Sequence, residues 1–233
     1  MPAPAVIASY NTHGGVGIDF RFAPERIARV LGELRADIIA LQELRSRAAG
    51  YDMLDLLRRS TGYQAIAGPT LKFAEGEFGN GLLTRFEVIS AELIKLDVAG
   101  REPRGAIDAL LDVHGMQLRV IATHLGLHPL ERREQITRLL DVVRTRSAPC
   151  TVLLGDLNEW FLRRRALRWL HEHFGESPAH ATYPSLLPVF ALDRVWCTPA
   201  AALRDVRVHC SRLARVASDH LPLLAELDCG DER

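Results

Sequence analysis

The sequence predicts an α/β fold in which helices cover two β-sheets within one domain, residues 1–233. Apolar runs of strand length occur in both halves of the chain, and segments with apolar residues at helical spacing lie among them. No Pro- or Ser-rich linker divides the chain, and 233 residues suit one α/β domain. At this size, a chain with 48% hydrophobic residues can bury enough apolar area to fold without disulfide bonds or a structural metal.

The first part of the chain predicts two strands, each followed by a helix. Residues 6–10 form a short apolar strand, and a glycine-rich turn follows at 14–17. Pro24 opens a helix, because proline is favoured at the first helical position. The apolar face of this helix consists of Ile27, Val30, Leu31 and Leu34. A second strand at 38–41 precedes a short helix at 52–59.

Between Tyr63 and Thr123 the pattern changes to strands and turns. The expected strands are 81–83, 88–93, 106–113 and 118–123. His114-Gly115 predicts a hairpin turn between the last two of these strands.

The last part of the chain returns to alternating helices and strands. Pro129 opens a helix in which Ile136, Leu139, Leu140 and Val143 share one face. A strand at 151–154 and an Arg-rich helix near 163–171 follow. After a loop around 183–188, the final strands are expected at 192–197, 203–208 and 221–227.

Composition excludes some classes of protein. Lys plus Arg and Asp plus Glu number 29 each, so net charge gives no global attraction to nucleic acid or an anionic membrane. The four cysteines form no CxxC pair, which argues against a structural zinc site. The N-terminus lacks the pattern of a signal peptide, and no transmembrane segment is predicted. We therefore expect a cytoplasmic monomer.

Polar, chemically capable residues lie at one end of five apolar strands. They are Asn11, Glu43, His124, Asp156 with Asn158, and Asp219 with His220. Each alone has a plain structural explanation, such as a turn asparagine or a solvated glutamate. Together they predict a single site lined with hard oxygen ligands for Mg²⁺ and with imidazoles for proton transfer.

Seven short motifs carry a family resemblance across residues 10–220. In order they are Tyr10-Asn11, Gln42-Glu43, Gly79-Asn80-Gly81-Leu82-Leu83, Thr123-His124-Leu125, Gly155-Asp156-Leu157-Asn158, Leu192-Asp193-Arg194-Val195 and Ser218-Asp219-His220. The series resembles the endonuclease/exonuclease/phosphatase superfamily, which includes pancreatic-type deoxyribonuclease, abasic-site endonucleases and bacterial sphingomyelinases. The resemblance implies a four-layer α/β/β/α sandwich with two mixed β-sheets packed face to face. It also implies a Mg²⁺-dependent phosphodiester hydrolase, with Mn²⁺ as an alternative ion.

The resemblance implies a role for each matching residue. Glu43 matches the principal metal ligand, and Asn11 matches a residue that helps to hold the metal site or the phosphate. Asp219 matches a residue that completes the surroundings of the metal through water. His220 contacts the scissile phosphate, and Asp193 orients it. Asp156 and His220 are rival candidates for the general base. The residues expected to bind phosphate are Asn80, Arg104, His124 and Asn158, of which His124 and Asn158 also belong to the catalytic set.

The substrate stays open at this level. An endo- or exonuclease-like activity on nucleic acid is the first interpretation. The alternatives are hydrolysis of a small-molecule or lipid phosphoester, as in a sphingomyelinase, and a scaffold of the same fold that has lost catalysis. The position two residues after Asn11 holds His13, where abasic-site endonucleases usually carry an acid, so a repair nuclease is disfavoured. The number of metal ions is open too.

Overall fold

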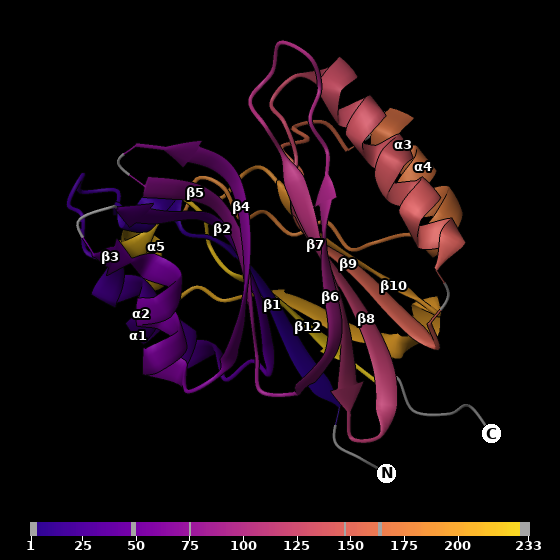
Figure 1. Ribbon diagram of the computed structural model, residues 1–233, viewed down its shortest axis with the longest axis horizontal. Helices are drawn as coiled ribbons and strands as arrows, with labels where there is room; N and C mark the ends of the chain where they lie inside the picture. Colours follow the sequence, from indigo (N-terminus) through magenta and orange to yellow (C-terminus); the bar gives the residue numbers. More distant parts are fainter. Residues whose placement is uncertain (1–3, 48–49, 75, 147, 163–164, 229–233) are drawn as a thin grey trace.

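Two β-sheets pack face to face and helices cover their outer faces (Figure 1). This architecture comes from a computed structural model that describes residues 4–47, 50–74, 76–146, 148–162 and 165–228. The expected four-layer α/β/β/α sandwich with two mixed sheets is therefore confirmed.

The first sheet contains seven strands within the described residues. They are β1 (Ala5–Asn11), β2 (Ile38–Arg47), β3 (Tyr51–Asp52), β4 (Gln64–Phe73), β5 (Gly76–Thr84), β11 (Leu203–Val208) and β12 (Leu223–Leu227). The strand order is β11-β12-β1-β2-β5-β4, and β3 pairs with β2. β1 and β2 run parallel, which brings their carboxyl ends to the same edge of the sheet.

The second sheet contains five strands in the same described part of the chain. They are β6 (Glu87–Lys95), β7 (Gly105–Val113), β8 (Met116–His124), β9 (Cys150–Asp156) and β10 (Asp193–Thr198). Their order is β10-β9-β8-β7-β6, and β8 and β9 are parallel. In Figure 1 the two sheets diverge towards the top of the view.

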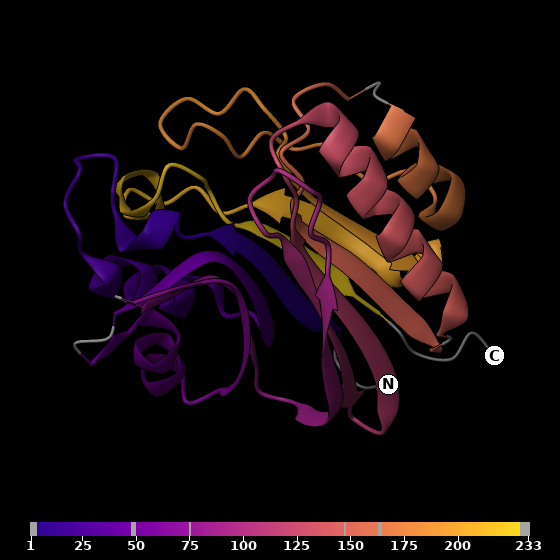
Figure 2. The same cartoon turned by 45° about the horizontal axis from the view of Figure 1, so that its top comes forward.

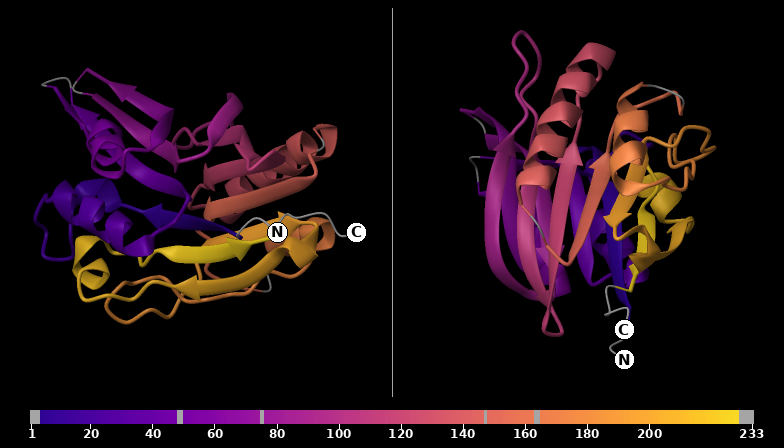
Figure 3. Two further views of the ribbon diagram at one scale, coloured as in Figure 1. Left: turned by 90° about the horizontal axis from the view of Figure 1, so that it is seen from below. Right: turned by 90° about the vertical axis from the view of Figure 1, so that its right-hand side faces the viewer.

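Helices form the two outer layers, as the two views of Figure 3 show. α1 (Pro24–Leu34), α2 (Met53–Thr61) and α5 (Ala214–Ala217) pack on the first sheet, and α3 (Pro129–Thr145) and α4 (Arg165–Phe174) pack on the second. Short 3-10 helices lie at His13–Gly15 and Ala200–Ala202. None of these described helices has the length and hydropathy needed to cross a membrane.

Side chains alternate between the two faces of each strand, and this alternation divides the core. In the centre, Ile38 and Leu82 of the first sheet pack in one buried cluster with Ile107 and Val120 of the second. Their neighbours along the strands turn outward, so that Ile39 packs with the apolar face of α1. A third cluster joins the second sheet to α3 and α4.

The structure adds elements that the sequence patterns did not predict. β4 is the edge strand of the first sheet, and α5 is one short turn of helix before His220. The expected strand at 151–154 extends to Asp156, and the expected helix near 163–171 is α4, which continues to Phe174. Arg163 and Arg164 lie outside the described residues.

Candidate active site

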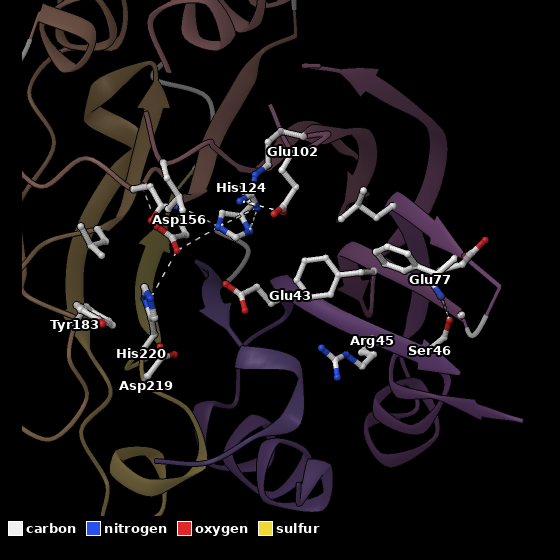
Figure 4. A pocket seen from close by; sticks show the side chains of 18 of the residues that line it. Glu43, Arg45, Ser46, Glu77, Glu102, His124, Asp156, Tyr183, Asp219 and His220 are labelled. Atoms are coloured by element: carbon white, nitrogen blue, oxygen red, sulfur yellow. Dashed lines mark hydrogen bonds and ion pairs between the residues drawn. The ribbon is translucent and has the colours of Figure 1, made fainter. Parts of the chain in front are cut away.

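Strand register brings the polar strand ends together. His124 at the end of β8 is the register partner of Asp156 at the end of β9, and Asp156 is in turn the partner of Asp193 at the start of β10. These three residues therefore form a row across one edge of the second sheet. Figure 4 shows His124, Asp156 and His220 beside one another, with Glu43 facing them from the first sheet.

Glu43 reaches this edge through an irregularity in β2. The register between β2 and β5 shifts between Leu41 and Leu44, and Glu43 has a left-handed backbone conformation with φ of 58°. A bulge of this kind re-aims a side chain relative to a regular strand. The carboxylate of Glu43 therefore lines the cleft while its neighbour Gln42 stays fully buried.

Asn11 links the two sheets through its side-chain amide. Its Nδ2 donates to Glu43 Oε1 at 3.0 Å and to Asp156 Oδ2 at 2.9 Å. Its Oδ1 accepts the backbone N–H of His13 at 3.0 Å. Asn11 therefore fixes the separation between the carboxylates of Glu43 and Asp156, which come from different sheets.

Asp156 and Asn158 form a tight turn at the end of β9. The backbone N–H of Asn158 donates to Asp156 Oδ1 at 2.9 Å, and Asn158 has a φ of 51°. This is an Asx turn, and asparagine tolerates its left-handed conformation. The side-chain Nδ2 of Asn158 lies 3.0 Å from His124 Nε2 and donates to the Leu125 carbonyl at 3.0 Å. The turn thus directs both polar side chains towards the same place.

His220 is held by the carboxylate of Asp193. His220 Nδ1 lies 2.8 Å from Asp193 Oδ2, and His220 Nε2 lies 3.7 Å from Asp156 Oδ2. Burial lowers the pKa of His220, but the negative charges of Asp193 and Asp156 outweigh burial and raise the pKa to about 10. The ring of Tyr183 packs against His220 with centroids 4.9 Å apart.

His124 lies between two groups that donate hydrogen bonds. Arg104 Nη1 approaches His124 Nδ1 at 3.1 Å, while Asn158 Nδ2 approaches the other ring nitrogen. A neutral imidazole can accept one of these two hydrogen bonds, and an imidazolium can accept neither. Burial, together with the charge of Arg104, lowers the pKa of His124 to about 3 against the attraction of Asp156. The neutral ring is therefore the stable form at this site.

The site opens into a cleft of about 1010 Å³. The predicted residues on its walls are Glu43, Arg104, His124, Asp156, Asn158, Asp219 and His220. Asn11 and Asp193 are not among the wall residues, and each contacts one that is. Asn80 also lies off the wall, and its amide donates to the Gly105 carbonyl next to Arg104 at 3.0 Å.

Negative charge is concentrated at one end of the cleft. Glu43 is largely buried, and burial raises its pKa, as do the nearby carboxylates of Asp219 and Asp156. In the described residues, no group of three or more His, Cys, Asp and Glu side chains is arranged to hold a metal ion by itself. Carboxylate oxygens in this setting suit Mg²⁺, which takes few protein ligands and keeps several waters.

Two supporting residues had no role assigned from the sequence, although Ser218 stands in the last of the seven motifs. Thr182 is fully buried, and its Oγ1 donates to Asp193 Oδ2 at 2.6 Å, the same oxygen that His220 contacts. Ser218 Oγ donates to the Asn11 carbonyl at 2.7 Å and so ties the segment before β12 to the end of β1. A buried threonine beside Tyr183-Pro184 gives no sequence signal of its own.

Comparison with known proteins agrees with this geometry. The model of the Endonuclease/Exonuclease/phosphatase family matches residues 8–220. The protein YbhP of Escherichia coli K12 is 27% identical over 243 residues, and the match covers 95% of each chain.

Solved structures share the fold at lower identity. An endonuclease/exonuclease/phosphatase from Beutenbergia cavernae superposes with a TM-score of 0.80 at 23% identity, covering 98% of this chain and 72% of that one. The human Nocturnin catalytic domain, solved with a bound sulfate anion, gives a TM-score of 0.72 at 19% identity, covering 97% and 93% of the two chains.

Proposed function

Because the chain belongs to the Endonuclease/Exonuclease/phosphatase family, we propose that it is a Mg²⁺-dependent hydrolase that cleaves a phosphodiester by attack of water at phosphorus. One observation carries the proposal: Asn11 bridges the carboxylates of Glu43 and Asp156 from two sheets, within a cleft that His220 also enters. The human Nocturnin catalytic domain, which shares this fold, was solved with a bound sulfate anion, and sulfate resembles phosphate in shape and charge.

Glu43 and Asp219 would hold the ion. Both line the cleft, and their mutual repulsion with Asp156 would be offset by a divalent cation. Asn11 donates its amide to both carboxylates and uses its oxygen on His13, so we assign it to orienting Glu43. When bound, Mg²⁺ neutralises charge on the phosphoryl oxygens and makes water more acidic.

We assign the general base to Asp156. Its Oδ2 lies 3.6 Å from His124 Nε2 and 3.7 Å from His220 Nε2, so a water beside this carboxylate would also contact both rings. Asp193 holds the Nδ1 side of His220 and leaves Nε2 directed into the cleft. The carboxylates around His220 favour its protonated form, which donates a hydrogen bond to a phosphoryl oxygen.

Arg104 would bind the phosphoryl group beside these residues, and Asn158, whose amide donates to the Leu125 carbonyl and faces His124, would position His124. Arg104 is buried with its guanidinium between His124 and Glu102, and its Nε has no hydrogen-bond partner among the described residues. A buried guanidinium with a free N–H suits a phosphate oxygen. Asn80 fixes the carbonyl of Gly105, and we assign it to positioning Arg104.

The test is hydrolysis of bis-p-nitrophenyl phosphate with Mg²⁺ or Mn²⁺. We expect activity in the wild type and a loss of more than about 100-fold in Glu43→Gln and in His220→Ala, because each removes a charge interaction made in the transition state. Glu77→Gln is the matched control, since Glu77 lines the cleft but pairs with Lys72. A wild type that is inactive with every divalent ion would favour a binding scaffold over an enzyme.

A further inference from the structure

The cleft continues from the carboxylates into an apolar part. Leu71, Phe73 and Phe78 line it from the β4–β5 hairpin, and Leu127 and Trp160 line it from the loops after β8 and β9. Glu77 of the hairpin and Tyr183 lie on opposite sides in Figure 4. A phosphoester bound at the carboxylates would therefore place its remaining group against hydrocarbon.

Beyond the cleft the same loops expose large apolar side chains. We call this surface the apolar rim and define it as Leu127, Trp160, Leu162, Leu187, Val189 and Phe190. Leu187 is 74% exposed and Leu162 is 54% exposed, and exposed apolar side chains in number mark interaction surfaces. The segment before β10, drawn in orange, projects beyond the edge of the sheets in Figure 2.

Specific contacts hold the loops of the apolar rim together. The ring of Trp160 meets Phe190 with centroids 4.8 Å apart and Tyr183 at 5.6 Å. The buried guanidinium of Arg132 pairs with Glu159 at 3.1 Å and also donates to the Leu127 carbonyl at 2.6 Å. These contacts fix the three loops of the apolar rim relative to one another.

The occupant must present a phosphoester and an apolar surface together, because Leu127 and Trp160 belong to both the cleft and the rim. Nucleic acid presents repeated phosphates and needs cations along its path. The rim segments 125–130 and 186–192 contain no Lys or Arg, and the sequence of the third segment continues from Leu162 into three arginines. On the cleft wall, Arg45 and Arg104 lie among the carboxylates of Glu43, Glu77 and Glu102, so the cleft has no continuous path of cations. A phospholipid in a bilayer meets both requirements.

We propose that the substrate is a phospholipid and that the apolar rim rests on the bilayer surface that carries it. The assignment of a phospholipid substrate rests on the proposed phosphodiesterase function. The assignment of a membrane contact rests on the apolar rim alone. The phosphoester enters between Glu43 and His220 while its acyl chains lie along Leu127 and Trp160.

The test compares two matched double variants by sedimentation with phosphatidylcholine–phosphatidylglycerol vesicles. Leu162→Ser/Leu187→Ser removes two aliphatic side chains from the rim, and Ile89→Ser/Leu93→Ser removes two that are 47% and 52% exposed on β6. We expect vesicle binding to fall about tenfold in the rim variant only. Hydrolysis of bis-p-nitrophenyl phosphate should stay equal in both variants, while hydrolysis of vesicle lipid should fall in the rim variant.

Four results would overturn the inference. The wild type could stay in the supernatant, or the rim variant could sediment like the wild type. The wild type could form a dimer that the rim variant loses, without vesicle binding, which would show that a second copy covers the rim. Cleavage of plasmid DNA without cleavage of vesicle lipid would overturn the substrate class. Failure to hydrolyse bis-p-nitrophenyl phosphate would instead count against the proposed function, and the sedimentation result would still be read independently.

Discussion

At the scale of single residues, the pair of His220 and Asp193 depends on contacts that no local sequence pattern displays. The Nδ1 of His220 donates to a carboxylate oxygen that also accepts from Thr182. The motifs around positions 193 and 220 predicted the pair, but Thr182 could not be identified because a buried threonine is common in any core. Its function follows only from the position of the segment 182–190 against the residues that precede β12.

Asp193→Asn should therefore lower turnover of bis-p-nitrophenyl phosphate by about 10²–10⁴-fold. An amide removes the negative charge that keeps the His220 ring protonated and holds it in place. Steady-state kinetics with Mg²⁺ measure the effect, and Asp205→Asn on exposed β11 is the control. Unchanged turnover would show that Asp193 does not position His220, and a large fall in unfolding free energy would assign it a structural role.

His124 gives a pH dependence of stability with a definite sign. Its pKa is lowered from 6.5 to about 3 in the folded protein, chiefly by burial. Between pH 6.5 and pH 3 the unfolded chain binds a proton at His124 and the folded chain does not. The neutral ring of His124 therefore contributes its full stability above pH 6.5, and this stability is lost as the pH falls towards 3.

Urea unfolding with EDTA between pH 4 and pH 7 measures this contribution. The wild type should lose more stability on acidification than His124→Asn, because the variant has no imidazole to protonate. The exposed His180→Asn should follow the wild type. Parallel curves for wild type and His124→Asn would mean that His124 is charged in the folded protein.

At the scale of strands and helices, local patterns predicted most elements but not their partners. The 3.6-residue period in α1 is dictated by one neighbouring layer, so the sequence displays it. β4 contains Pro69 and a register shift beside it, which suits an edge strand and weakens the strand pattern. The four residues of α5 are too few to establish a period.

Gly155 illustrates how an element delivers a functional residue. It has a φ of 146°, and a Cβ built on it would lie 1.9 Å from the Thr123 carbonyl of neighbouring β8. Only glycine lets β9 approach β8 this closely immediately before Asp156. The sequence motif Gly-Asp-Leu-Asn therefore carries a packing requirement as well as chemistry.

Gly155→Ala should lower the unfolding free energy by about 2–4 kcal/mol, since it adds a clash to backbone strain. Gly115→Ala is the control: Gly115 also has a positive φ, of 86°, but open space around its Cβ position. That variant should lose only about 1–2 kcal/mol. Equal losses in urea unfolding would show that backbone conformation, and not the approach of β8, makes Gly155 necessary.

At the scale of the whole molecule, the site exists because two sheets meet. Asn11 and Asp156 are 145 positions apart and belong to different sheets, yet they are joined by one hydrogen bond of 2.9 Å. The order of motifs along the chain predicted which residues would meet, through family resemblance. The strand order, such as β1 between β12 and β2, was beyond sequence patterns because pairing partners are distant and locally unmarked.

The meeting of the sheets gathers the carboxylates of Glu43, Asp156 and Asp219, so binding of a cation should stabilise the whole fold. At Mg²⁺ concentrations near 100 times the dissociation constant, linkage gives about 2.7 kcal/mol, or a melting shift of about 5–10 °C. Glu43→Gln should show little shift with Mg²⁺, and without metal it should melt above the metal-free wild type because repulsion is relieved. Calorimetry with EDTA, Mg²⁺ and Mn²⁺ measures both effects, with Glu77→Gln expected to match the wild type. If no ion shifts the wild-type melting temperature, the folded cleft does not hold a metal, and the Mg²⁺-dependent part of the mechanism is wrong.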